Sequence, residues 1–235
     1  MKIVAFASQK GGSGKTTLAG HIAVEAERSG MGPVVLIDLD PQGSLSLWWR
    51  AREGDRPDFV ETTEEELSDT IERLRESGAK LVIIDTPPAI TATIGRVVAA
   101  CDLVVIPTRP SPHDLRAAGA TVQLCDRLSK PIVFAINGAA QRARITTEAV
   151  IALSHHGSVA PAVVHQRVDF ASSMIDGRTV MELPGSSRSP DEISGLWNFI
   201  SDCLEGRVRL RSGGTSPAYG QASMFEGGLE VKGAA

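Results

Sequence analysis

The stretch Lys10-Gly11-Gly12-Ser13-Gly14-Lys15-Thr16-Thr17 decides the fold, because it directly follows an apolar run over residues 3–7. The apolar run predicts a buried strand, and Leu18, Ile22 and Ala26 recur at helical spacing after the loop. The glycines let the backbone curl so that successive N–H groups point inward and form an anion-binding nest at a helix N-terminus. The sequence therefore predicts a strand, a phosphate-binding loop and a helix.

Side chains of this loop supply the remaining chemistry. Lys15 would neutralise the β- and γ-phosphates of a nucleotide, and the Thr16 hydroxyl would complete a Mg²⁺ shell, so we expect a nucleoside triphosphate and Mg²⁺ as cofactors. Lys10 lies five residues before Lys15 and is not required by the ordinary loop pattern. A cation at this position needs an anion, and its own loop offers no obvious one.

Carboxylates follow two further apolar runs. Asp38 and Asp40 come at the end of one run and Asp85 at the end of another. Ligands bind at the carboxyl ends of strands in an open α/β sheet, so we expect all three beside the phosphate loop. Asp85 is predicted to organise Mg²⁺, through coordinated water. Asp38 and Asp40 face the same way in an extended chain, and they would repel each other unless a metal, a lysine or a proton separates them.

The second lysine makes the chain resemble the deviant Walker A ATPases, the group of ParA-type partition proteins, MinD-type proteins and the nitrogenase iron protein. Three more segments resemble that family's motifs in the same order: residues 34–43, residues 81–88, and residues 103–107 with 111–115. The resemblance extends over roughly residues 1–200. Within the family, the chain is most similar to the small ParF-like subgroup of ParA proteins.

This resemblance implies roles for individual residues. Lys10 is expected to reach across a nucleotide-sandwich homodimer to the phosphates held by the other subunit. Asp40 is expected to orient the attacking water, and Asp38 to support the metal or the loop. The catalytic set is then Lys10, Lys15 and Asp40, and the metal set is Thr16, Asp38 and Asp85. Asn137, at the end of a predicted strand, is assigned to the adenine pocket, with a turn residue as the alternative.

Strand and helix patterns alternate along the chain. Strands are expected at 34–39, 81–85, 103–106, 132–137 and 159–164, and helices at 15–29, within 50–77, and at 92–100, 113–129, 146–155, 169–176 and 190–204. Repeated β-then-α units predict an α/β fold with a mostly parallel twisted sheet and helices on both faces. We expect an ATPase domain over residues 1–205 and a flexible Gly/Ser-rich tail over residues 206–235.

Composition agrees with this fold. The chain has 235 residues, of which 42% are hydrophobic and only 4% aromatic, so the core should be aliphatic, as buried parallel strands require. The three scattered cysteines predict reduced thiols and a cytoplasmic protein, and the resemblance to ParA proteins implies association with the nucleoid. No apolar run approaches the roughly 20 residues that span a bilayer. Glycines and Pro217 in the tail oppose an amphipathic helix, so no membrane binding is expected.

The resemblance also implies ATP-dependent, nonspecific DNA binding, although the net charge is −4. A net negative charge does not exclude this, because a local cluster of arginines decides the interaction. The candidates are Arg142, Arg144, Arg167 and Arg178, with Arg167 the best single choice because His165-Gln166-Arg167 resembles a DNA-contacting segment of ParF-like proteins. Arg207, Arg209 and Arg211 form a second candidate, as a tethered basic arm.

Hydrolysis is expected to be slow without a partner, because no dedicated arginine finger is obvious. A ParB-like or small ribbon-helix-helix adaptor protein is predicted to stimulate it. The leading hypothesis is thus a DNA-segregation or cargo-positioning ATPase, with plasmid, chromosome and protein cargo left open. The alternative is a metabolic enzyme or metal-cluster carrier of the same superfamily. About 30 residues after position 205 cannot hold a glutaminase domain, and the cysteines lack the paired spacing of a cluster carrier.

Overall fold

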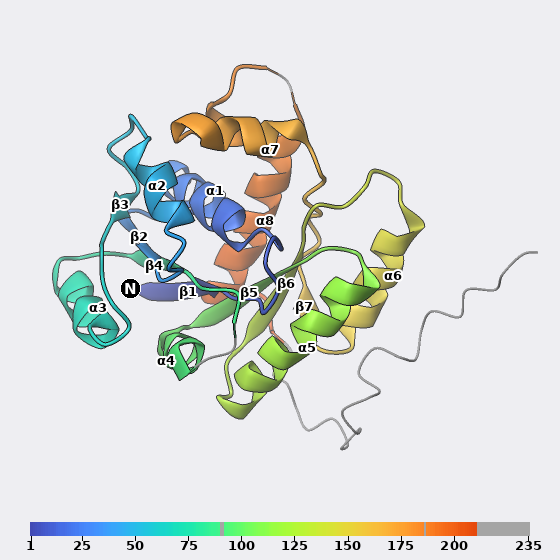
Figure 1. The fold of residues 1–235 in the computed structure, drawn as a ribbon, viewed down its shortest axis with the longest axis horizontal. Coiled ribbons are helices and arrows are strands. Elements are labelled where there is room, and N and C mark those ends of the chain that lie inside the picture. The colour runs from blue at the N-terminus through green and yellow to red at the C-terminus, as the bar shows by residue number, and fades with distance from the viewer. Residues whose placement is uncertain (90–91, 186, 211–235) are drawn as a thin grey trace, which may run out of the picture.

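The computed structural model describes residues 1–89, 92–185 and 187–210, and within them a seven-stranded parallel sheet forms the centre (Figure 1). The strand order is β3-β2-β4-β1-β5-β6-β7, and each neighbouring pair is parallel. The strands are β1 (Lys2–Phe6), β2 (Val34–Asp38), β3 (Asp58–Phe59), β4 (Leu81–Asp85), β5 (Leu103–Thr108), β6 (Ile132–Ile136) and β7 (Ser158–Val159). β1 lies in the middle, so the loop that follows it opens at the centre of the carboxyl edge.

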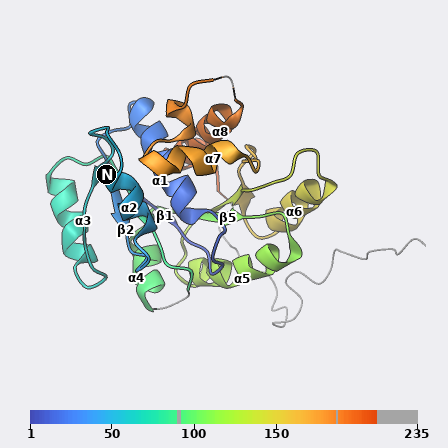
Figure 2. The same ribbon diagram turned by 45° about the horizontal axis from the view of Figure 1, so that its top comes forward.

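Helices cover both faces of the sheet (Figure 2). One layer contains α1 (Lys15–Arg28), α2 (Ser44–Arg50), α7 (Val168–Ser173) and α8 (Ser189–Leu204), together with the 3₁₀ turns η1 (Met174–Asp176) and η2 (Val180–Glu182). The other contains α3 (Leu67–Glu76), α4 (Ala92–Ala100), α5 (Pro112–Arg127) and α6 (Arg144–Ser154). The predicted fold class is therefore confirmed, including the helices on both faces.

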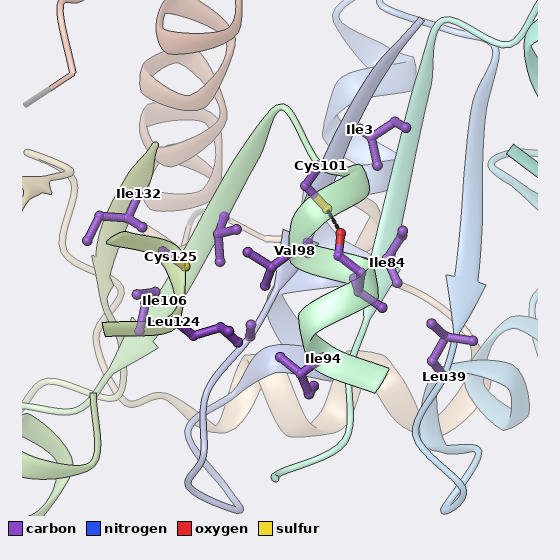
Figure 3. Packing of buried hydrophobic residues seen from close by; sticks show 14 of the residues in the cluster. Ile3, Leu39, Ile84, Ile94, Val98, Cys101, Ile106, Leu124, Cys125 and Ile132 are labelled. Atoms are coloured by element: carbon purple, nitrogen blue, oxygen red, sulfur yellow. Dashed lines mark hydrogen bonds between the residues drawn. The ribbon is translucent and has the colours of Figure 1, made fainter. Parts of the chain in front are cut away.

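Two aliphatic clusters fill the space between the sheet and its helix layers. Alternate residues of each strand enter opposite clusters: Ile3 faces the layer of α3 to α6, and Val4 faces the layer of α1 and α8. Figure 3 shows part of the first cluster, where Ile94 and Val98 of α4 pack near strand residues such as Ile84. Parallel strands buried on both faces need this continuous apolar content, which the sequence supplies.

Buried cysteines belong to this packing. The Cys101 thiol donates a hydrogen bond to the Val97 carbonyl oxygen at 3.0 Å, and Cys125 is fully buried in the same cluster (Figure 3). Burial raises the pKa of both thiols, so they stay protonated and unreactive at neutral pH. Cys203 is also buried and free. The cysteines therefore act as small core residues.

Three tryptophans likewise fix contacts between elements. Trp48 packs against Gly20 of α1, where an added Cβ would come within 3.2 Å of the indole. The Trp48 indole N–H donates to the Arg178 carbonyl at 3.0 Å, and that of Trp197 donates to Ser29 Oγ at 2.7 Å. The Trp49 ring stacks on Phe59 with centroids 5.2 Å apart.

The main differences from the predicted elements lie after β2 and near β7. The helix α2 and the short strand β3 were not predicted, since seven and two residues are too short to show a hydrophobic period. The strand expected at 159–164 is reduced to β7, and the helix expected at 169–176 divides into α7 and η1. Each of the other predicted elements is present with its ends shifted by a few residues.

The predicted tail falls largely outside the described residues. α8 ends at Leu204, and residues 211–235, including Arg211, are not described, so the division at 205 and the basic arm stay predictions. Within the described ranges, the helices are too short or too polar to cross a bilayer.

Phe134 of β6 is fully buried, which makes it a direct test of the core. Phe134→Ala should lower the free energy of unfolding by about 3–5 kcal/mol, because the loss of the ring leaves a cavity that close-packed neighbours cannot fill. Urea unfolding followed by circular dichroism measures it. Phe199→Ala, which truncates a half-buried ring of α8, is the matched control and should lose clearly less. Equal losses would contradict the packing described here.

Candidate nucleotide-binding site

A cavity of about 880 Å³ opens at the carboxyl edge of the sheet, above the central strands. One wall is the predicted phosphate loop, with Gly11, Gly12, Gly14, Lys15, Thr16 and Thr17. Asp40 stands on another side, Asn137 and Arg109 line the region after β5 and β6, and Phe170 and Met174 add apolar surface. A volume of this size with one polar, N–H-rich wall and one apolar wall suits a nucleotide.

The phosphate loop is shaped by glycine and braced from β6. Gly14 has φ +100°, a left-handed conformation, and is the N-cap of α1. The Asn137 side-chain amide donates to the Ser13 carbonyl oxygen at 2.7 Å, and a Cβ on Gly14 would lie 2.0 Å from Asn137 Nδ2. Only glycine permits both the backbone angle and this close approach. Asn137 thus lines the cavity and holds the loop; the adenine contact expected of it stays a prediction.

Thr16 and Asp85 meet beneath the loop. The Thr16 hydroxyl donates to Asp85 Oδ2 at 2.5 Å, while Asp85 Oδ1 is buried and has no hydrogen-bond partner among the described residues. Burial raises the pKa of Asp85 to about 7, an effect that the Thr16 hydrogen bond only partly offsets. A buried carboxylate oxygen without a partner, beside a hydroxyl and an anion nest, fits a Mg²⁺ ion held through water.

Asp38 takes a role in holding the loop after β2. Its Oδ1 accepts from the Asp40 backbone N–H and its Oδ2 from the Ser46 N–H, each at 3.0 Å, so it closes the turn that begins α2. Both oxygens are therefore engaged with backbone. Two roles were expected for Asp38, and this arrangement agrees with the one in which it holds the loop. Its assignment as a metal ligand stays a prediction.

Lys15 and Asp40 both line the cavity. Lys15 is buried at the base of the loop, with Nζ 3.5 Å from the Lys10 carbonyl oxygen, and burial lowers its pKa despite the opposing charges of Asp85 and Asp40. A desolvated ammonium gains from an incoming phosphate. Asp40 Oδ1 accepts from the Gln42 N–H at 3.0 Å, which fixes the carboxylate at the cavity wall where it can hold a water.

Lys10 forms an ion pair with Asp114 and does not line the cavity formed by the described residues. Its ammonium is hydrogen-bonded to Asp114 Oδ2 on α5 of the same chain. The Ser111 hydroxyl donates to the same carboxylate oxygen and accepts from the Asp114 N–H at 3.2 Å, as the N-cap of α5. Ser111 and Asp114 lie within the motif at 111–115, but their contact with Lys10 was not predicted. The available signal was that β1 and β5 are neighbours in the parallel sheet, so the loops after them lie side by side.

Arg109 is a second residue that the sequence analysis missed. It follows β5 directly, is exposed, lines the cavity, and lies beside Gly138, where an added Cβ would be 3.4 Å from its Nε. A basic residue directly after a buried strand was the available signal, because such residues gather at the ligand-binding edge.

The predicted DNA-binding arginines are not brought together into one cluster. Arg142 and Arg144 are exposed at the start of α6, where Arg144 pairs with Glu148 at 2.9 Å. Arg178 is exposed near η2 and pairs with Asp176 at 2.6 Å. Arg167, the preferred choice, is only 16% exposed and forms a two-pronged ion pair with Glu192 at 2.5 and 2.7 Å. Arg167 therefore already has a carboxylate partner, and its role as a DNA contact stays a prediction.

The parallel sheet, the loop at its centre and the carboxylates at its strand ends define a P-loop nucleotide-binding protein. The chain belongs to the CobQ/CobB/MinD/ParA nucleotide-binding domain family, whose model matches residues 4–180. The ParA/MinD members of this family are P-loop ATPases. The resemblance inferred from the four sequence motifs is thereby confirmed.

The chain is similar in sequence to two relatives and in fold to two solved structures. The chain is 29% identical over 209 residues to "Maintenance of carboxysome distribution protein A" of Halothiobacillus neapolitanus, covering 84% of this chain and 95% of that one. It is 34% identical over 128 residues to "Protein ParA" of Rhizobium radiobacter, covering 53% and 56%. Its fold is similar to a Borrelia burgdorferi plasmid partition protein bound to AMPPNP (TM-score 0.68, 17% identity, 86% and 99% covered) and to Pyrococcus furiosus MinD (0.72, 16%, 86% and 99%).

The buried Asp85 should make stability depend on pH in the unliganded protein. Between about pH 4 and 7 the unfolded chain loses the Asp85 proton while the folded protein retains it, so Asp85 lowers the free energy of unfolding as pH rises through this window. Asp85→Asn should therefore gain stability over wild type as pH rises, up to about 4 kcal/mol at pH 7. Denaturant unfolding across the window measures it. Exposed Asp69→Asn is the control, and a pH-independent gain would contradict the account.

Asn137→Ala should loosen the phosphate loop. Loss of the hydrogen bond to Ser13 should weaken binding of AMPPNP by about 2- to 10-fold, measured by calorimetry. A loop-bracing role predicts equal weakening for adenine and guanine nucleotides, whereas an adenine contact predicts a selective loss for adenine. Exposed Asn198→Ala is the matched control. Unchanged affinity would remove Asn137 from the site.

Proposed function

We propose that this protein is an ATP-driven switch that positions or segregates a cargo on DNA. In this proposal ATP joins two copies into a sandwich dimer, the dimer binds DNA without sequence preference, and hydrolysis stimulated by an adaptor releases it. The observation that carries the proposal is the presence of two lysines in one phosphate loop. Lys15 lines the cavity where phosphates would bind, whereas Lys10 is not required by its own site. Lys10 would instead contact phosphates held by a second copy.

The site residues divide the ATPase chemistry among themselves. Backbone N–H groups of the loop and the Lys15 ammonium bind the β- and γ-phosphates and stabilise charge that develops on them. Asp40, whose Oδ1 accepts from the Gln42 N–H, would orient the attacking water. Thr16 and Asp85 would hold a Mg²⁺ ion, which would supply positive charge against the phosphates. Lys10 from the second copy would complete the site.

Apolar side chains at the mouth of the cavity support the sandwich dimer. Leu47, Val168 and Ile175 are 64%, 79% and 80% exposed, and Leu47 and Ile175 line the cavity rim. They come from α2, α7 and η1, all in the layer that borders the nucleotide. Large apolar residues that gather at one exposed rim favour contact with another protein surface, and a second copy facing the nucleotide would cover them.

DNA binding is proposed to depend on dimerisation. Each phosphate that an arginine neutralises releases counterions, so contacts add on a logarithmic scale. Arg142 and Arg144 on one protomer offer few contacts, whereas two protomers with their α6 helices on one side would double them. We therefore place DNA near the start of α6, ahead of the ion-paired Arg167, with exposed Arg178 as a further contact.

The cargo is proposed from the relatives. One is named for carboxysome distribution and others are named as ParA or as a "Chromosome-partitioning ATPase". We propose a protein assembly or a replicon as cargo, linked through a ParB-like or ribbon-helix-helix adaptor that triggers hydrolysis at the nucleoid. Without the adaptor, we expect hydrolysis of ATP to be slow and to depend on Mg²⁺.

Binding to a labelled random-sequence duplex tests this proposal. With ATP, wild-type protein should bind tightly, and with ADP or no nucleotide it should bind at least about tenfold more weakly, because only the dimer presents enough cations. Lys10→Ala should lose the ATP effect. The logarithm of the affinity should fall steeply with the logarithm of the salt concentration. Fluorescence anisotropy measures each case.

Arginine variants then locate the surface. Arg142→Ala with Arg144→Ala should weaken DNA binding and flatten the salt dependence, since each lost phosphate contact removes about 0.9 from the slope. Arg75→Ala on α3, an exposed arginine at the far edge of the sheet, is the matched control. Binding that is absent or independent of nucleotide would contradict the DNA-switch proposal.

A further inference from the structure

We propose that Asp114 is a latch that holds Lys10 within its own protomer and so raises the threshold for ATP-driven dimerisation. This inference rests on the proposed function, because it concerns how Lys10 becomes available to a second copy. It assigns a regulatory role to the start of α5. This segment is outside the phosphate loop, and Asp114 is not one of the carboxylates assigned to the metal, which are Asp38 and Asp85.

The contact itself is intramolecular and well enclosed. The Asp114 side chain is only 4% exposed, and Lys10, at 38%, is bonded to its Oδ2. Among the described residues, Gly11 and Gly12 line the cavity and Lys10 does not, and the Lys10 ammonium is bonded to Asp114 on α5. A side chain bonded to a buried carboxylate of its own chain cannot at the same time extend to phosphates held by another copy.

Asp114 keeps stabilising contacts at Oδ2 when it releases Lys10, while its Oδ1 is buried and has no hydrogen-bond partner among the described residues. The Ser111 hydroxyl already donates to Oδ2, and the carboxylate belongs to the first turn of α5, a helix of 16 residues. The positive end of the helix dipole and the hydroxyl keep stabilising the carboxylate after the lysine has left. The pair is therefore an exchangeable contact, in which phosphates of the second copy replace Asp114 as the counter-ion of Lys10.

This exchange makes dimerisation sensitive to Asp114. Each protomer gives up one Lys10–Asp114 pair when the sandwich forms, so two pairs are lost for each dimer. A partly exposed ion pair is worth up to about fivefold in an equilibrium constant. Removing the latch should therefore tighten the dimer between about twofold and 25-fold.

The experiment measures the dimer dissociation constant by sedimentation equilibrium with AMPPNP and Mg²⁺. Asp114→Asn keeps the shape of the side chain and its N–H contact to Ser111 while removing the charge. Its dimer should be tighter than wild type by the factor above. Asp126→Asn removes the same charge from an exposed position on the same helix and should match wild type. The double variant Lys10→Ala, Asp114→Asn should be no tighter than Lys10→Ala alone.

Other results would overturn the inference. An Asp114→Asn dimer equal to or weaker than wild type would mean that Asp114 orients Lys10 or serves only the fold. Should that variant unfold, lysine NMR on wild-type protein decides instead: the Lys10 side-chain signals should move when AMPPNP forms the dimer, and signals that stay in place would overturn the latch.

The proposed function fails separately, if wild-type protein stays monomeric with AMPPNP at every concentration reached. In that case a dimer formed by Asp114→Asn would still support the latch, and a variant that also stays monomeric would overturn it.

Discussion

The structure depends on one cluster of unpaired backbone donors. β1 ends in the middle of a parallel sheet, and the chain then turns through a glycine-rich loop into α1, whose first N–H groups have no acceptor within the helix. These donors, the helix dipole and the desolvated Lys15 create a site that is incomplete without an anion. The cavity, the bracing by Asn137 and the position of the carboxylates all follow from the need to hold this loop in place.

The carboxylates around the loop differ in whether they already have a positively charged partner before the nucleotide and its metal bind. Asp85 is buried with one oxygen lacking a partner, and burial raises its pKa to about 7, an arrangement that costs stability in the empty protein. Binding a nucleotide with its metal would relieve that cost. Lys10 differs, because Asp114 satisfies it before any ligand binds. In the free protomer, Asp85 and Lys15 therefore lack the charged partners that a nucleotide and its metal would bring, whereas Lys10 already has Asp114 as its counter-ion. This contrast separates binding of ATP from dimerisation.

Much of the fold and the centre of the site could be predicted, because their signals are local in sequence. The loop at 10–17 and the carboxylates at strand ends are short motifs beside apolar runs, and the sheet follows from alternating strand and helix patterns. The remaining features are contacts between distant segments. Lys10 and Asp114 are 104 residues apart, Asn137 and Ser13 are 124 apart, and no local pattern reports either pair. The ion pair between Arg167 and Glu192, 25 residues later, is likewise a contact that the motif around Arg167 does not report.

The central claim is that Lys10 completes the site of the other copy, and mixing two inactive variants tests it most directly. Lys10→Ala lacks the bridging lysine and Asp40→Ala lacks the residue that holds water, so each alone should release little phosphate from ATP. In a mixed dimer, Lys10 of the Asp40→Ala copy can reach the site that retains Asp40. An equal mixture should recover about a quarter of the wild-type rate, since half the dimers are mixed and each has one complete site. A mixture as inactive as its components would show that Lys10 does not act across the dimer.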